Sequence, residues 1–178
     1  MGEFERDKKN RKTAIEAAYA YLANRMRTKA EVEKHLAEKG YSAAEITETV
    51  NELIGMRYID DHLYAVRYYE YNREKKRGVQ RAECELIEKG VDKETAQFAK
   101  EDFLFENRVD EYEDALAIAR KEVFVPSDVY GGAPEIREPD EKLCAKIARK
   151  LGSKGYSNGD IFRVLDTLRR ESRDAKEE

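Results

Sequence analysis

The residue types best suited to catalysis or metal binding are few in this chain and widely spaced. His35 and His62 are the only histidines, and neither has the spacing of a metal site or of a Cys-His pair. Asp60 and Asp61 are adjacent carboxylates, but neighbouring residues of a helix do not face each other, and an aspartate before an apolar stretch is typical of an N-cap. The sequence contains no P-loop and no G-x-S-x-G, H-E-x-x-H or Cys-x-x-Cys motif. We therefore expect no catalytic residue, no metal and no cofactor, and a protein that is not an enzyme.

Basic side chains offer a different chemistry, the binding of an anionic partner. The largest cluster consists of Arg67, Arg73, Lys75, Lys76, Arg77 and Arg81, opposed in that interval by Glu70 and Glu74. Interleaved tyrosines, Tyr68, Tyr69 and Tyr71, can stack on bases or pack on a protein surface. A solvated helix face with core tyrosines explains the same pattern, so both interpretations stay open. Smaller clusters are Arg25, Arg27 and Lys29, and Arg149, Lys150 and Lys154.

The overall composition limits where such binding can occur. The chain has 178 residues, enough for a core, with 34 Lys plus Arg against 38 Asp plus Glu. A net charge of -4 is unlike that of a free nucleic-acid binder, so any such contact must be local. The mean hydropathy of -0.86 and the charged N-terminus predict a cytoplasmic protein without a membrane span. Cys84 and Cys144 are too few for a disulfide framework and are predicted to be buried thiols.

An internal repeat organises the chain. Leu36–Ser42, Leu86–Asp92 and Leu151–Ser157 share a leucine, a Lys-Gly pair and, in the last position, a Ser or Asp. Glycine after a final lysine provides the left-handed end of a helix, and the Ser or Asp can cap the next one. Each string therefore predicts a helix end, a short turn and a helix start.

Each copy is predicted to contain three helices. The first is expected over 14–24, 61–75 and 110–122, and the second spans about 11 residues (~16 Å) before each turn. In the third helix, apolar residues recur six, ten and thirteen positions after Gly40 and Gly155, whereas the middle copy has Lys100 at one of these positions. With no Trp and abundant Ala, Glu, Lys, Arg and Leu, the composition agrees with an all-α fold of three tandem three-helix repeats.

These patterns predict the domain boundaries. We expect a flexible N-terminus over 1–12, repeat 1 over 13–56, repeat 2 over 57–106, repeat 3 over 107–172 and a flexible C-terminus over 173–178. Capping boxes are expected at Thr28 with Glu31, Ser42 with Glu45 and Asp110 with Glu113. All three prolines fall within 124–139, which is predicted as a loop inserted in repeat 3, either a mobile arm or a partner contact.

Several of these strings resemble the RecX family of recombinase regulators. The resemblance rests on Leu22-Ala23-Asn24-Arg25-Met26-Arg27-Thr28, Glu31 to Leu36, Gly40-Tyr41-Ser42, Leu53, Tyr58-Ile59-Asp60-Asp61, Ala65, Gly78 and Leu86 to Gly90, and it extends over about Ala14 to Arg170. It implies an elongated, curved array of repeats that binds RecA nucleoprotein filaments and restrains their recombinase activity. It also implies contact with DNA within the filament and no need for a cofactor.

Carried over by position, the resemblance and the local charge excess identify the candidate contacts. The expected contacts to the RecA filament or its DNA are Arg25, Arg27, Arg67, Arg73, Lys76, Arg77 and Arg81. Tyr58, Asp60 and Asp61 are expected to join repeats. A monomer is expected because no long heptad seam is evident.

Two other functions remain open, a nucleic-acid-binding repeat protein that acts without RecA and a general helical interaction scaffold. A helix-turn-helix reading of 43–55 is disfavoured, because Glu45, Glu48 and Glu52 would face phosphates.

Overall fold

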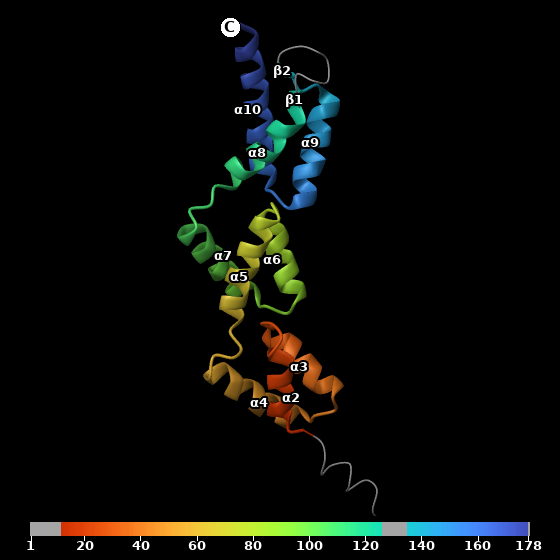
Figure 1. Ribbon diagram of the computed structural model, residues 1–178, viewed down its shortest axis with the longest axis vertical. Helices are drawn as coiled ribbons and strands as arrows, with labels where there is room; N and C mark the ends of the chain where they lie inside the picture. Colours follow the sequence, from red (N-terminus) through yellow and green to blue (C-terminus); the bar gives the residue numbers. More distant parts are fainter. Residues whose placement is uncertain (1–11, 126–134, 178) are drawn as a thin grey trace, which may run out of the picture. The chain divides into compact units, whose positions relative to one another are not determined.

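The computed structural model describes residues 12–125 and 135–177, and Figure 1 shows them as a succession of helices. The helices are α2 (Ala14–Leu22), α3 (Lys29–Glu38), α4 (Ala43–Gly55), α5 (Asp61–Glu74), α6 (Val79–Glu88), α7 (Lys93–Glu106), α8 (Glu111–Val123), α9 (Glu141–Lys154) and α10 (Asn158–Glu177). These nine helices of the described residues confirm the predicted all-α class. Within the same residues, no helix is long and apolar enough to cross a membrane.

The described residues form two compact units. The first contains the residues up to Arg67 together with Glu85–Ala99, and the second contains Tyr68–Cys84 together with the residues from Lys100 onward. Helices α5, α6 and α7 are thus each divided between the units. The repeat boundaries stay a prediction, because a compact unit is defined by contacts and a repeat by similarity of sequence.

In the first unit, α2, α3 and α4 enclose an apolar core. Its buried residues are Ala14, Ala18, Val32, Leu36, Val50, Leu53 and Ile59. The predicted capping boxes at Thr28 and Ser42 are both confirmed, and a further one at Thr13 begins α2. In each box the cap and a glutamate three residues later bond to each other's backbone amide, so every helix of this group begins at a defined residue.

In the second unit, α8, α9 and α10 form another apolar core. Its largest fully buried members are Leu116, Ile147, Leu151 and Leu168. Asp110 caps α8 and accepts from the Tyr112 and Glu113 amides at 3.0 and 3.3 Å, but the Glu113 side chain does not complete the predicted capping box. Buried methylene groups stabilise such a core by about 0.8 kcal/mol each.

The third helix of the middle copy forms despite the lysine at an apolar position. Phe103 on α7 is buried and stacks on Tyr69, with ring centroids 5.6 Å apart. Lys100 donates to Glu83 at 2.8 Å, and both side chains are largely buried. The ion pair supplies the partner that a half-buried ammonium requires.

The repeated Lys-Gly turns have two structural roles. Gly40, Gly90 and Gly155 all adopt the left-handed conformation, with φ of 78°, 83° and 86°. Gly90 also lies against Ala30, because a Cβ added there would come within 2.3 Å of the Ala30 Cβ. The glycine therefore ends one helix and admits another chain segment at close range.

Hydrogen bonds at these turns join each copy to the one before it. The Thr28 hydroxyl donates to the Lys89 carbonyl at 2.8 Å, and the Gly78 amide donates to the Lys154 carbonyl at 2.8 Å. Asp61 accepts from the Lys29 amide at 2.8 Å, which confirms the predicted joining role of Asp61. Asp60 instead caps α5 through the Leu63 amide at 2.8 Å.

The predicted loop over 124–139 contains a short ladder. Strand β1 (Phe124–Val125) pairs antiparallel with β2 (Glu135–Ile136), and Phe124 lies opposite Ile136. The ends of the segment can pair because all three prolines fall outside these strands. The residues between the strands, 126–134, lie outside the described part of the chain.

The prediction for the cysteines is half wrong. Cys144 is buried, but Cys84 is exposed. Cys84 follows the buried Ala82 by two positions on α6 and therefore points away from the side that Ala82 and Leu86 bury.

Candidate nucleic-acid interface

The seven predicted contact residues are divided between the two units. Arg25, Arg27 and Arg67 belong to the first, and Arg73, Lys76, Arg77 and Arg81 belong to the second. In the second unit, Arg73 and Arg77 line one cavity, and Arg73 and Lys76 line a second, more open hollow. The structure thus brings together three of the seven, Arg73, Lys76 and Arg77, at the end of α5 and in the turn that follows it.

The turn after α5 fixes where these side chains leave the backbone. Lys76 has a left-handed backbone (φ 54°), and its amide donates to the Arg73 carbonyl at 2.8 Å. The Arg77 amide donates to the Asn72 carbonyl at 3.0 Å. The cations gather at a helix C-terminus, where the backbone dipole favours positive charge. That effect stabilises the turn even without a partner.

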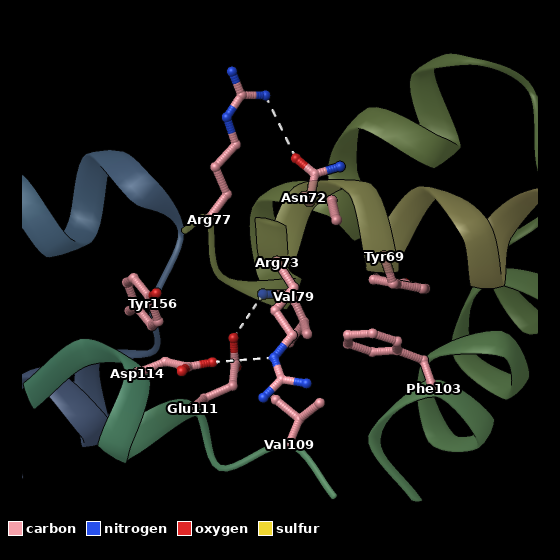
Figure 2. A pocket seen from close by; sticks show the side chains of 11 residues that line it. Tyr69, Asn72, Arg73, Arg77, Val79, Phe103, Val109, Glu111, Asp114 and Tyr156 are labelled. Carbon is pink, nitrogen blue, oxygen red and sulfur yellow. Dashed lines mark hydrogen bonds and ion pairs between the residues drawn. The ribbon is translucent and has the colours of Figure 1, made fainter. Parts of the chain in front are cut away.

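Arg73 is oriented by a carboxylate from α8. Its Nε lies 3.4 Å from the Asp114 Oδ2, and both side chains are exposed. Figure 2 shows Arg73 reaching from α5 toward Asp114 and Val109. Such a screened pair contributes about 0–1 kcal/mol, so an anionic partner can compete for Arg73. Sequence alone could not reveal Asp114, because it lies 41 positions from Arg73.

The carboxylate beside this pair has a structural role. Glu111 accepts from the Val79 amide at 2.8 Å and so caps the start of α6 (Figure 2). Burial raises the pKa of Glu111, and the neighbouring Asp160 and Asp114 carboxylates raise it further. Burial also raises the pKa of Tyr156 to about 12. The cavity that these groups line has a volume of about 10 Å³, room for one water molecule.

Of this cluster, Lys76 is exposed and Arg77 is partly buried, and both side chains leave the turn that follows α5. Figure 2 shows the Arg77 guanidinium directed away from the cavity, and its Nη1 donates weakly to Asn72 Oδ1 at 3.4 Å. The Lys76 side chain is exposed. Arg81 has a different position, because its Nη1 donates to the Ser153 carbonyl at 2.8 Å and so ties α6 to the last turn of α9.

The basic residues of the first unit also differ among themselves. Arg25 and Arg27 both approach Glu31, at 3.2 and 3.8 Å. The Arg27 guanidinium lies 4.2 Å from the centroid of the Tyr21 ring, and its side chain is only 16% exposed. Arg27 is therefore packed into the unit, whereas Arg25 and Arg67 remain accessible to a partner.

The arrangement can bind an anionic surface. No group of three or more His, Cys, Asp or Glu side chains converges within residues 12–125 and 135–177. What the geometry offers is exposed, positively charged side chains on ordered helix ends, which suits contact with phosphates or with acidic protein surface.

Comparison with known sequences gives consistent similarities. Residues 14–53 match the family profile described as RecX, first three-helix domain. A protein named regulatory protein RecX from Bacillus licheniformis is 30% identical over 172 residues, which cover 93% of this chain and 59% of that protein. Its namesake from Bacillus cytotoxicus is 28% identical over 90% of this chain and 56% of its own length. The chain therefore spans less than two thirds of the length of these relatives.

Solved structures show the same similarity. The crystal structure of RecX from Lactobacillus salivarius superposes with a TM-score of 0.68 and 26% identity, over 87% of this chain and 94% of that one. A second crystal structure, of regulatory protein RecX, has a TM-score of 0.67 at 24% identity and supports the fold.

Proposed function

Because the chain belongs to the RecX family, we propose that it is a regulatory protein that binds RecA nucleoprotein filaments and inhibits their recombinase and ATPase activities. The similarity to proteins named regulatory protein RecX over 93% of the chain carries this proposal. The role would lie in the control of DNA repair and recombination, in the cytoplasm, as a monomer and without a cofactor. Homologues named as regulators rather than enzymes indicate action by binding.

The proposed contacts are the accessible cations on both units. Lys76 and Arg77, with Arg73 beside them, would meet the filament or its DNA through the second unit, and Arg25 and Arg67 through the first. Exposed charges of this kind each contribute little, about 0–1 kcal/mol. Two sets on one chain reinforce each other, because binding of the first raises the effective concentration of the second.

This mode explains how an acidic protein could select a filament. A net charge of -4 opposes binding to bare DNA, whereas an assembled filament repeats the same contact surface along its length. Binding across neighbouring RecA subunits would then disfavour the rearrangements needed for ATP turnover or strand exchange.

The test is single-stranded-DNA-dependent ATP hydrolysis by RecA, titrated with this protein, next to binding of the same DNA without RecA. A charge-reversal variant carries Arg73→Glu, Lys76→Glu and Arg77→Glu. Its matched control carries Lys34→Glu, Lys93→Glu and Lys121→Glu, which change the net charge equally at exposed helix positions outside the candidate contacts. Circular dichroism checks that both variants retain their helices.

We expect inhibition by the wild type at concentrations that leave bare DNA unbound. The charge-reversal variant should need about tenfold more protein, since three lost contacts of roughly 0.5 kcal/mol approach the ~1.4 kcal/mol of a tenfold change. Equal inhibition by the variant and its control would show that the contacts lie elsewhere. Inhibition only where bare DNA is coated would indicate competition for DNA instead of filament regulation.

A nucleic-acid contact that does not need RecA is the second candidate function. It is favoured by a separate basic surface on α9, described next.

A further inference from the structure

The second helices of the three predicted repeats differ in the sign of their charge. Helix α9 carries five Lys or Arg residues against one carboxylate. The corresponding helices are acidic, since α3 has two cations against three carboxylates and α6 has one against three. Core packing does not require this difference, because the buried positions of α9 are Cys144, Ile147 and Leu151.

The cations of α9 gather on its exposed side. Lys142, Lys146, Arg149 and Lys150 are all exposed, and their spacing of four, three and one places them along one face of the helix. They extend over about 12 Å of helix axis. The other exposed residues of this helix side are small, Ala145, Gly152 and Ser153, so a large surface can approach the charges closely.

A carboxylate of α8 already occupies part of this surface. Glu122 accepts from Lys146 at 2.8 Å and also bonds to Lys150, with the lysine side chains 62% and 42% exposed. These two hydrogen bonds lower the pKa of Glu122, which therefore remains an anion at neutral pH. Two lysines one turn apart can thus close on one anionic group.

We propose that this face of α9, made of Lys142, Lys146, Arg149 and Lys150, binds the phosphate backbone of duplex DNA without reading its sequence. A duplex presents one negative charge per ≈1.7 Å, so 12 Å of helix meets several phosphates. The face has no aromatic residue on which an unpaired base could stack, which favours a duplex over a single strand. It also has no exposed large apolar residue that could enter a lipid surface, which disfavours a membrane.

This site is separate from the cations at the end of α5, and it does not depend on the proposed action on RecA. Binding is therefore measured with the full chain alone, by fluorescence anisotropy of a labelled 30-base-pair duplex over a range of salt concentrations. One strand of that duplex and vesicles containing phosphatidylserine serve as alternative ligands. The variants are Lys142→Gln with Arg149→Gln, and a matched control, Lys34→Gln with Lys93→Gln.

For about three phosphate contacts, a plot of the logarithm of duplex affinity against the logarithm of salt concentration should have a slope near -2.7. The slope for the double variant, which lacks two of these contacts, should be less negative by ~1.8. The control should leave the slope unchanged. A double variant that binds as the wild type does, or single strands or vesicles bound as tightly as the duplex, would overturn the assignment. RecA inhibition that fails while duplex binding persists would refute the proposed function and not this site.

Glu122 provides a variant that should gain affinity, which no folding defect can imitate. Glu122→Gln removes the competing anion and should tighten duplex binding about threefold, the equivalent of one ion pair of roughly 0.6 kcal/mol. Glu48→Gln on α4 changes the net charge equally and should have a smaller effect, because no cation of α9 depends on it. Equal effects of the two variants would contradict the role given to Glu122.

Discussion

Replacing Gly78 by alanine tests the joint between α6 and the turn after α9. Gly78 needs no left-handed backbone, so the substitution adds one methyl group and little backbone strain. That methyl would lie 2.2 Å from the Gly155 carbonyl oxygen, 2.5 Å from its carbon and 2.7 Å from the Tyr156 nitrogen. All three are backbone atoms, which cannot rotate away as a side chain can.

The size of the effect follows from the movement required. Ordinary contact distances for carbon are about 3.5 Å, so the two segments must separate by roughly 1 Å. The hydrogen bond from the Gly78 amide to the Lys154 carbonyl, 2.8 Å long, would then be lost. A buried donor without its partner costs about 1–3 kcal/mol, and overpacking costs a further ~1–3 kcal/mol. We expect Gly78→Ala to lower the free energy of unfolding by about 2–6 kcal/mol.

The measurement is urea unfolding followed by circular dichroism, combined with hydrogen exchange at the amide of residue 78. Exchange at this amide should accelerate in the variant. Gly55→Ala is the matched control, because a methyl group added to Gly55 at the end of α4 meets nothing within 4 Å. Alanine is favoured over glycine in a helix, so this control should be neutral or up to about 1 kcal/mol more stable. The contrary result is a free energy of unfolding for Gly78→Ala that equals the wild-type value to within about 0.5 kcal/mol, which is less than the ~1–3 kcal/mol of a lost hydrogen bond. That result would show that the tight joint does not exist.

Two further predictions concern the charged residues near the candidate site. Burial raises the pKa of Glu111 from its ordinary 4.5, so the contribution of this carboxyl to stability is present below that value and is lost as the pH rises through the folded-state pKa. Glu111→Gln keeps an acceptor for the Val79 amide, and its stability relative to the wild type should therefore rise between pH 4 and pH 7 in urea unfolding; a constant difference would contradict a buried charge. Arg27→Ala should lower the free energy of unfolding by about 1–3 kcal/mol, because Arg27 packs on Tyr21. Arg25→Ala should lower it by only about 0–1 kcal/mol, because Arg25 forms an exposed ion pair. Equal losses in thermal or urea unfolding would show that Arg27 is not a packing residue.

Much of the fold could be predicted from local signals. The capping boxes at Thr28 and Ser42, and the glycines at 40, 90 and 155, depend on chemistry within a few residues, and the structure confirms them. The ladder of β1 with β2 could not be predicted in this way, because pairing of Phe124 with Ile136 depends on contacts across twelve positions. The expectation that cysteines are buried likewise misplaced Cys84, which lies on the exposed side of α6.

The candidate site was less predictable, because charge along the sequence does not show which cations are already used. Asp114 and Ser153 lie far from Arg73 and Arg81 in the sequence, yet they determine how available those two arginines are. The same applies to Arg27, whose packing on Tyr21 no local pattern indicated. A basic cluster along the sequence thus does not by itself show which of its cations remain available to a partner.

The repeat explains why the charges could diverge while the fold did not. In the second and third copies, the Lys-Gly turn ends a helix and also accepts a hydrogen bond from the preceding copy, from Thr28 to Lys89 and from Gly78 to Lys154. These bonds end on backbone carbonyls, and on α6 the exposed Arg81 side chain adds a bond of its own to the Ser153 carbonyl. The cations of α9 and the carboxylates of α3 are not needed for either bond. The outer face of that helix is therefore free to be acidic in α3 and basic in α9 at no cost to the joints. Function in such a chain is determined by the exposed side chains of each copy. The positively charged face of α9 is where their effect on binding is most directly measured.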